Sequence, residues 1–279
     1  MLTGCCVMMK DLCMEITHMN DARFLVHQLR GLGHVEAPPS VLPSVLERTG
    51  HRDAYTQCDS PIGPVYVAYN GHGISVVLSA TSGAEFEAAF QSRFNRPLRN
   101  VESLPETLAS LWQQQWEQPS RSAMPVDLRG LKDFERAVLQ KAQEIPRGEM
   151  RPYAWVAREI GHPKAVRAVG TALGHNPIPL IIPCHRVGKS DGHIGNYAFG
   201  ATAKHMILAH EGIDVDALER MARSKVRYYG SDSTHIYCFP TCRNARRITD
   251  RHRVTFRSDA DATRSGYRPC KVCRPAVAA

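Results

Sequence analysis

The sequence has no apolar run long enough to cross a membrane. Spanning a bilayer as a helix takes roughly 18 to 20 consecutive apolar residues, and no stretch of the 279 residues reaches that length. The Met- and Cys-rich start also lacks the pattern of a signal peptide, in which basic residues precede an apolar segment. These absences argue against a membrane partner and predict a cytoplasmic protein.

Signals for a bound nucleotide or for S-adenosylmethionine are missing as well. Gly31-Leu32-Gly33 lacks the rest of a dinucleotide fingerprint and the strand that should precede it. We therefore expect no S-adenosylmethionine cofactor.

A disulfide framework is not expected, although the chain has nine cysteines. Thiols stay reduced in the cytoplasm, so regular spacing among them points to metal binding or catalysis instead. Cys5, Cys6 and Cys13 show no spacing that suits zinc.

Acidic residues are scarce in the last part of the chain. From residue 221 onward there are 13 Lys or Arg against four Asp, a net charge of +9, so residues 1–220 carry −1. A basic segment attracts polyanions because neutralised phosphates release their counterions. Since the basic residues are interleaved with predicted structure, the pattern favours nucleic acid over a merely soluble surface.

Turn and linker signals divide the chain. Cys58–Leu78 reads as two strands about the Asn70-Gly71 turn, and Glu85–Phe94 reads as a helix. Residues 118–127 form a polar linker, and Phe134–Glu144 is expected to be helical. We predict an α+β protein with five segments: an N-terminal extension of unknown role (1–50), a small mixed α/β unit (51–125), a helical unit (126–214), a linker (215–226) and a zinc-binding unit (227–279).

Two short helices in the helical unit form a helix-turn-helix candidate. Pro152 can open the first helix, Gly161 can end it in a left-handed cap, and Pro163 can start the second at once. The second helix carries Lys164, Arg167 and Thr171 on its outer face, and Val166, Val169 and Leu173 on its inner face. An ordinary surface helix with solvated charges is the alternative.

Cys184 is a candidate nucleophile. It follows the apolar segment 178–182 and stands beside His185 and Arg186. A thiol is mostly protonated at neutral pH, so a nucleophilic cysteine needs a neighbouring base or cation. We expect His185 to act through a water and Glu211, at the end of a helix from about Thr202, to orient the imidazole. Core packing is the alternative for Cys184, and solvent exposure is the alternative for Glu211.

Four cysteines near the end of the chain have the spacing of a zinc site. They form two short pairs, Cys238 with Cys242 and Cys270 with Cys273. Four thiolates give a Zn²⁺ site a formal charge of −2, so an exposed sulfur there is a good nucleophile, and a closed structural site is the alternative. Between the pairs, His252–Phe256 reads as a strand and Ser258–Arg264 as a capped helix, a unit too small to fold without its metal.

The segment from Arg167 through Pro183-Cys184-His185-Arg186-Val187, followed by Gly195-Asn196-Tyr197 and Lys204–Gly212, resembles the methylated-DNA–protein-cysteine methyltransferases. The resemblance covers about 55–214. It implies a ribonuclease H-like amino-terminal unit, a helix-turn-helix unit that binds double-stranded DNA, and an irreversible attack of Cys184 on the methyl group at guanine O6.

The resemblance also implies roles for individual residues. His185 and Glu211 form a relay and Asn176 braces the turn, while Tyr153 and Arg167 flip the damaged nucleotide out of the stack. The expected DNA-binding residues are Tyr153, Lys164, Arg167, Thr171 and Arg186, and the expected base-pocket residues are Val187, Tyr197 and Ala198. Many family members have Ser-Gly where this chain has Ala198-Phe199, which predicts a narrower pocket that still accepts methyl.

The cysteine-rich segments, Thr234–Cys242 and Gly266–Pro275, resemble the metal-binding domains of bacterial Ada repair proteins. This second resemblance implies that Cys238 accepts methyl from a backbone phosphotriester and that Cys242, Cys270 and Cys273 complete the zinc site. Together the two resemblances predict a monomeric, single-turnover DNA repair methyltransferase with Zn²⁺. The alternative is a methylation-sensing DNA-binding transcriptional regulator.

Overall fold

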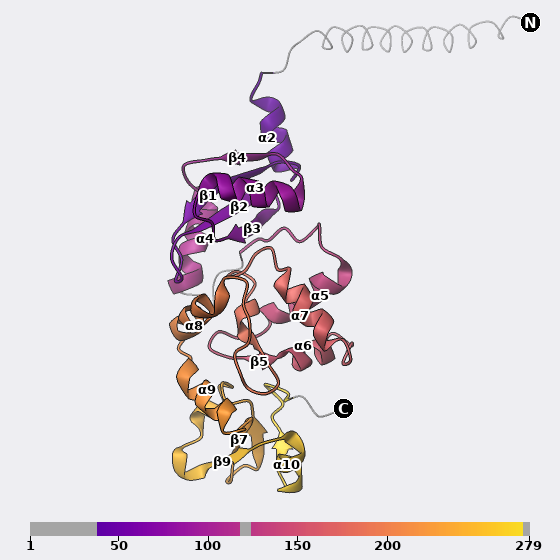
Figure 1. Cartoon of the computed structure of the whole chain (residues 1–279), viewed down its shortest axis with the longest axis vertical. Helices are drawn as coiled ribbons and strands as arrows, with labels where there is room; N and C mark the ends of the chain where they lie inside the picture. Colours follow the sequence, from indigo (N-terminus) through magenta and orange to yellow (C-terminus); the bar gives the residue numbers. More distant parts are fainter. Residues whose placement is uncertain (1–37, 118–123, 276–279) are drawn as a thin grey trace, which may run out of the picture. The chain divides into compact units, whose positions relative to one another are not determined.

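The computed structural model describes residues 38–117 and 124–275 (Figure 1). The described residues fall into two units, one that ends at Leu46 and one that begins at Glu47. Of the predicted extension 1–50, residues 1–37 lie outside the described part. Helix α2 (Val41–Arg48) follows them. In the described ranges, no helix is long and apolar enough to cross a membrane.

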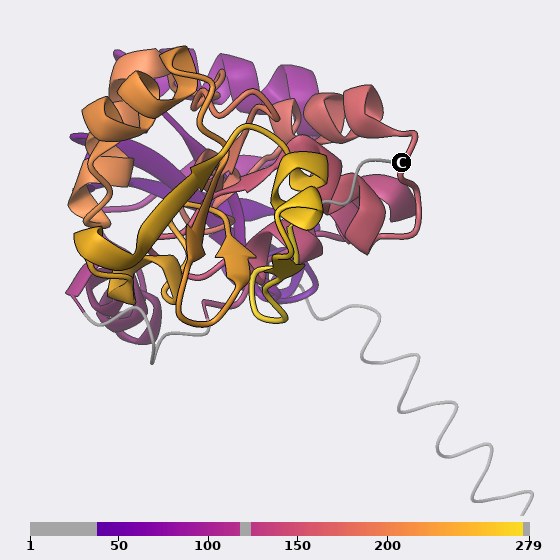
Figure 2. The ribbon, with the colours of Figure 1, turned by 90° about the horizontal axis from the view of Figure 1, so that it is seen from below.

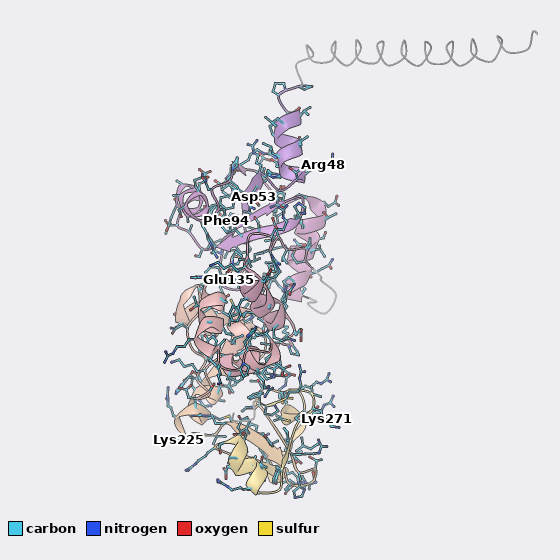
Figure 3. All side chains as sticks on the ribbon, turned by 90° about the vertical axis from the view of Figure 1, so that its right-hand side faces the viewer. Arg48, Asp53, Phe94, Glu135, Lys225 and Lys271 are labelled. Atoms are coloured by element: carbon cyan, nitrogen blue, oxygen red, sulfur yellow. The ribbon has the colours of Figure 1, made fainter. Side chains whose placement is uncertain are left out.

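A four-stranded sheet forms the amino-terminal part of the second unit. Its strands are β1 (Asp53–Cys58), β2 (Val65–Asn70), β3 (Gly73–Leu78) and β4 (Leu98–Asn100), in the order β3-β2-β1-β4. Strands β2 and β3 confirm the predicted hairpin, whereas β1 and β4 were not predicted. Strand β1, which begins at Asp53 (Figure 3), pairs antiparallel with β2 and parallel with β4.

Two helices, α3 and α4, belong to the same part of the chain as this sheet. Helix α3 (Gly83–Phe94) confirms the helix predicted over 85–94 and buries Phe86 and Phe90. Helix α4 (Glu106–Glu117) buries Leu108 and Trp112. The sheet also supports the segment before Cys184, because the Val77 amide on β3 donates to the Pro177 carbonyl at 2.9 Å.

The helical unit contains α5 (Asp133–Gln143), β5 (Arg151–Pro152), α6 (Tyr153–Glu159), α7 (Val166–Gly174), the 3-10 turn η1 (Cys184–Arg186), β6 (Val187–Gly188) and α8 (Gly200–His210). Helix α5 lies one residue from its predicted bounds. Strand β5 pairs in parallel with β6, so the residues before α6 are bound to those after the Cys184 turn.

Helices α6 and α7 confirm the predicted helix-turn-helix pair, with one correction. Gly161 adopts a left-handed conformation with a φ of 80° just after α6, as predicted for a cap. The second helix begins at Val166 instead of Pro163. Lys164 therefore lies in the turn between the helices and not on the outer face of α7.

The carboxyl-terminal part is a second four-stranded sheet. The predicted linker 215–226 is largely helical, because α9 (Val215–Arg223) occupies it. The strands β7 (Tyr228–Ser231), β8 (Ile236–Cys238), β9 (Arg253–Phe256) and β10 (Arg268–Pro269) follow in the order β10-β8-β7-β9. Strand β9 and helix α10 (Asp259–Arg264), capped by Ser258, confirm the elements predicted between the cysteine pairs (Figure 2).

Candidate active site

Cys184 lies in a tightly braced turn. Its side chain is buried, and its Sγ accepts a hydrogen bond from Asn176 Nδ2 at 3.2 Å. The same Nδ2 donates to the Ile182 carbonyl at 3.1 Å, and Asn176 Oδ1 accepts from the Ile178 amide at 3.0 Å. Asn176 therefore holds both ends of the turn that presents the sulfur.

His185 and Glu211 form the pair expected of a relay. His185 Nε2 lies 2.9 Å from Glu211 Oε1, and both side chains are buried. Within the described part of the chain, the other ring nitrogen, Nδ1, is buried without a hydrogen-bond partner. The imidazole is thus oriented by the carboxylate at one nitrogen and can exchange a proton at the other.

Arg186 completes this cluster, and its guanidinium contacts Glu211 and the Ile145 carbonyl instead of facing a DNA-binding surface as expected. Its Nη2 donates to Glu211 Oε1 at 2.7 Å, its Nε donates to Glu211 Oε2 at 3.0 Å, and its Nη1 donates to the Ile145 carbonyl at 2.7 Å. With its donors directed at protein oxygens and only 9% of its surface exposed, Arg186 is a buried partner of Glu211.

The protonation of the cluster follows from burial and from these contacts. Burial raises the pKa of Glu211, but the hydrogen bonds and charges of His185 and Arg186 outweigh it and lower the pKa to about 2. Burial lowers the pKa of His185 below its ordinary value despite the nearby carboxylate. An ionised Glu211 and a neutral imidazole at pH 7 suit His185 to accept a proton.

Lys204 is a buried cation beside the thiol, and no separate role was predicted for it. Its Nζ donates to the Val187 carbonyl at 2.7 Å and to the Asn196 carbonyl at 3.2 Å. Burial lowers its pKa to about 8. Burial also raises the pKa of Cys184, while the Asn176 bond and the charge of Lys204 lower it. Lys204 therefore both favours the thiolate and ties the 196 loop to β6.

The predicted base-pocket residues lie around this cluster. Val187 is fully buried, and the Tyr197 ring packs edge-on against His185 with the ring centroids 5.9 Å apart. Phe199 also packs edge-on against Tyr197, with the ring centroids 5.6 Å apart. Ala198 is exposed. The side chains of His185, Tyr197 and Phe199 thus form a continuous row of ring contacts.

The predicted DNA-reading residues lie mostly at the surface of the helix-turn-helix. Arg167 and Thr171 are exposed on α7, and Lys164 is exposed in the turn before it. Tyr153 is half-buried at the start of α6. These positions agree with a protein surface that can meet a duplex, and the parallel pairing of β5 with β6 places Tyr153 next to the strand that follows the Cys184 turn.

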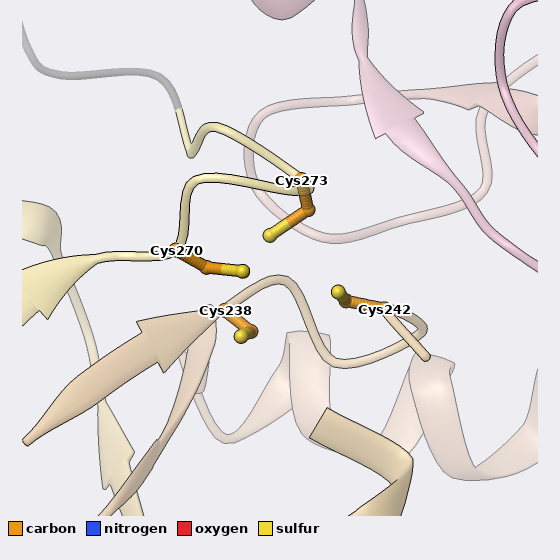
Figure 4. A group of neighbouring side chains, drawn as sticks. All are labelled: Cys238, Cys242, Cys270 and Cys273. Atoms are coloured by element: carbon orange, nitrogen blue, oxygen red, sulfur yellow. The ribbon is translucent and has the colours of Figure 1, made fainter. Parts of the chain in front are cut away.

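The four carboxyl-terminal cysteines converge on one point, with their sulfurs directed at one another (Figure 4). All four Sγ atoms lie within 4.8 Å of one another, and all four residues are buried. Tetrahedral Zn²⁺ with Zn–S bonds of about 2.3 Å places its sulfurs about 3.8 Å apart. The donor set and its spacing therefore fit a four-thiolate zinc site formed by Cys238, Cys242, Cys270 and Cys273.

Neutralising Glu211 should remove an acid-sensitive part of the stability. A carboxyl group whose pKa is lower in the folded than in the unfolded state stabilises the fold above its unfolded pKa, and that stabilisation is lost as the pH falls through the folded value. With a folded pKa of about 2, the Glu211 contribution of about 3 kcal/mol should disappear between pH 5 and 2. The free energy of unfolding, measured with urea, should therefore fall less between pH 5 and 2 for Glu211→Gln than for the wild-type protein. If the free energy of unfolding depended on pH in the same way in both proteins, the assignment of this stabilisation to Glu211 would be wrong.

Two family models match adjoining parts of the chain. The model described as "6-O-methylguanine DNA methyltransferase, DNA binding domain" matches residues 133–213, and the model described as "Metal binding domain of Ada" matches residues 218–276. The first match contains Cys184, His185 and Glu211. The second contains all four cysteines of the metal centre.

Similar proteins carry related names. The methylated-DNA–protein-cysteine methyltransferase of Rattus norvegicus is 36% identical over 173 residues, which are 57% of this chain and 82% of that protein. The bifunctional transcriptional activator/DNA repair enzyme Ada of Escherichia coli is 36% identical over 163 residues, 56% of this chain but only 45% of Ada.

A solved structure of Mycobacterium tuberculosis OGT in complex with DNA is 32% identical, with 57% of this chain and 92% of that chain covered and a TM-score of 0.48. Because more than a third of the aligned residues are identical over most of the rat protein's length, this chain belongs to the methylated-DNA–protein-cysteine methyltransferase family.

Proposed function

We propose that this protein repairs double-stranded DNA by transferring the methyl group of O6-methylguanine to Cys184. The observation that carries the proposal is the Cys184 turn itself, in which a buried thiol meets Asn176 and Lys204 beside the His185–Glu211 pair. The same arrangement lies inside the region that matches the 6-O-methylguanine methyltransferase model. A buried cysteine with these neighbours is built for nucleophilic chemistry, not for packing alone.

The transfer is a single displacement at the methyl carbon. The thiol proton passes through a water to His185, whose imidazolium the Glu211 carboxylate stabilises. The sulfur then forms a bond to the methyl carbon, the bond from carbon to O6 breaks, and its electron pair stays with the guanine. The guanine takes up a proton at N1 to become neutral, which balances the proton that Cys184 released. Because a thioether does not release its methyl group, each protein molecule reacts once.

The stoichiometry tests this proposal. Purified protein mixed with a duplex that carries one O6-methylguanine should restore one guanine per protein molecule and then stop, as followed by nucleoside chromatography. Continued turnover would show a different mechanism, and absence of restored guanine would refute the repair function.

DNA recognition is assigned to the exposed side of the helix-turn-helix. Lys164, Arg167 and Thr171 would contact the duplex, and Tyr153 with Arg167 would extrude the damaged nucleotide. We further propose that the protein acts as a cytoplasmic monomer. It should need no S-adenosylmethionine, because the methyl donor is the DNA.

Truncating Arg167 should slow the repair. Without the guanidinium to fill the vacated stack, flipping becomes less favourable by a few kcal/mol, so Arg167→Ala should lower the transfer rate by about 10- to 100-fold. Single-turnover assays with the O6-methylguanine duplex measure this rate. Arg220→Ala removes an exposed arginine from α9 and is the charge-matched control. Equal losses in both variants would mean that only overall charge matters.

The zinc centre is proposed as a second acceptor site. The four thiolates would hold Zn²⁺, which keeps the sulfurs ionised and nucleophilic. Cys238 would accept methyl from a methylphosphotriester, but it is only 2% exposed. Acceptance therefore requires the 239–241 loop, which adjoins Cys238, to open.

A duplex carrying one methylphosphotriester tests the second site. Methyl found on the Cys238 peptide would support the two-acceptor proposal. If no methyl appears on any of the four cysteines, the zinc domain is a structural or DNA-binding accessory. The narrower proposal, in which methylation at this centre regulates transcription, would need the methylated protein to bind DNA more tightly than the unmethylated one.

A further inference from the structure

The five residues Gly148–Pro152 contact both the residues around Cys184 and the loop between Cys238 and Cys242. On one side, the Gly148 amide donates to Glu211 Oε2 at 3.2 Å, and β5 pairs with β6 directly after the Cys184 turn. On the other side, the Met150 amide donates to Thr241 Oγ1 at 2.8 Å. The same segment leads straight into Tyr153. We call Gly148–Pro152 the connecting segment.

A buried ion pair fastens the connecting segment to the loop between the first two metal ligands. Glu149 and Arg151 form this pair, with side chains that are 1% and 3% exposed. The other Glu149 oxygen, Oε1, accepts from the Arg243 amide at 2.9 Å, directly after Cys242. The Arg151 guanidinium lies over the Phe239 ring, 5.5 Å from its centroid. A change in the conformation of the 238–243 loop would therefore move the connecting segment.

The far end of α6 is fastened to the chain that leaves the last metal ligand. Arg158 Nη1 donates to the Pro275 carbonyl at 2.9 Å and its Nη2 donates to the Arg274 carbonyl. Arg274 in turn pairs with Glu159 at 2.6 Å. Both ends of α6 are thus held by residues that adjoin zinc-binding cysteines.

From these contacts we propose that the metal centre positions α6 and the connecting segment, so that Cys184 repair depends on metal loading of the four cysteines. Without the metal, the four thiols, whose sulfurs lie within 4.8 Å of one another, have no ion to hold them together. The loop at 238–243 and the chain after Cys273 then lose their fixed conformation. Glu149, Thr241 and Arg158 are positioning residues in this scheme, since none of them touches the base or the sulfur of Cys184. The inference rests on the proposed function of Cys184.

The first test compares zinc-loaded and zinc-free forms of the full chain, the latter prepared with a chelator and a reductant. Hydrogen exchange of the amides from 148 to 159 is measured by mass spectrometry, alongside the single-turnover transfer rate to Cys184. Zinc removal should accelerate exchange in this segment and lower the rate at saturating DNA by at least about tenfold. Unchanged exchange and an unchanged rate would overturn the proposal.

Two substitutions keep the metal in place and cut only the connection. Glu149→Gln weakens the ion pair, and Thr241→Val removes the acceptor of the Met150 amide. Both should retain one zinc per chain yet exchange faster at residues 150–156 and transfer methyl about tenfold more slowly at saturating DNA. If Glu149 and Thr241 only stabilised the fold, the substitutions would lower the melting temperature but leave the transfer rate unchanged well below that temperature. That outcome would contradict the proposal.

Glu144→Gln is the matched control, because it makes the same chemical change at an exposed glutamate, which pairs with Lys141 at the end of α5. If Glu149→Gln and Thr241→Val behave like Glu144→Gln in exchange and in rate, the proposal is wrong. If zinc-loaded wild-type protein never methylates Cys184, the proposed function fails instead, and the exchange measurements still decide whether the metal centre positions α6.

Discussion

Replacing Cys184 with alanine should abolish repair of O6-methylguanine while leaving the protein folded. The variant keeps Asn176, His185 and Glu211 but has no sulfur in the braced turn. Among the described cysteines outside the metal centre, the other thiol is Cys58, whose pKa burial raises to about 11. A thiol so rarely ionised cannot substitute as nucleophile. Chromatography of the restored guanine, after incubation with excess variant, measures the loss.

Cys58→Ser is the control for this experiment. It removes one thiol from the end of β1, outside the Cys184 turn, and should repair at the wild-type rate. Guanine restoration by Cys184→Ala at a measurable rate would contradict the assignment of the acceptor. Circular dichroism should show that both variants retain wild-type secondary structure, because one buried sulfur contributes little to it.

Cys242→Ser should remove the zinc and unfold the carboxyl-terminal sheet. That sheet has strands of only two to four residues, and its own core is small, comprising Tyr237, Phe256, Ala262 and Tyr267. Binding of structural Zn²⁺ supplies on the order of 10 kcal/mol to such units. We expect the variant to bind no stoichiometric zinc and to lose protection from hydrogen exchange throughout residues 228–275.

The metal content and the exchange pattern are measured on the same preparation. Because Cys242 is not the proposed acceptor, the result is independent of any chemistry at Cys238. Cys58→Ser should again match the wild type, with one zinc per chain. A Cys242→Ser protein that keeps its zinc and its protected sheet would show that the four cysteines do not act as one metal site.

The elements with local signals could be predicted from the sequence. The Asn70-Gly71 turn, the cap at Gly161 and the serine cap at Ser258 each depend on residues close together in the chain. Strand β4 lacks such a signal because its parallel pairing with β1 joins residues more than 40 positions apart. A buried network has no local signal either, because in it Asn70 donates to Asp53 and to Asp127, which lie 17 and 57 positions away in the chain.

The candidate site also contains residues whose roles could be predicted from the sequence and residues whose roles could not. The neighbours of Cys184 in sequence predicted a nucleophile beside an imidazole, and the contact of His185 with Glu211 follows that prediction. The roles of Arg186 and Lys204 were not predictable, because an arginine or lysine that packs inward looks the same in sequence as one at the surface. Their burial depends on where α8 packs against the Cys184 turn.

Peptide mapping of the reacted wild-type protein is the most direct test of the account. The zinc-loaded chain is incubated with a duplex containing a single O6-methylguanine, digested, and analysed by mass spectrometry. The account predicts one added methyl group, on the peptide that contains Cys184, in an amount equal to the guanine restored. Restored guanine with the methyl group on any other residue, or with no methylated peptide, would contradict it.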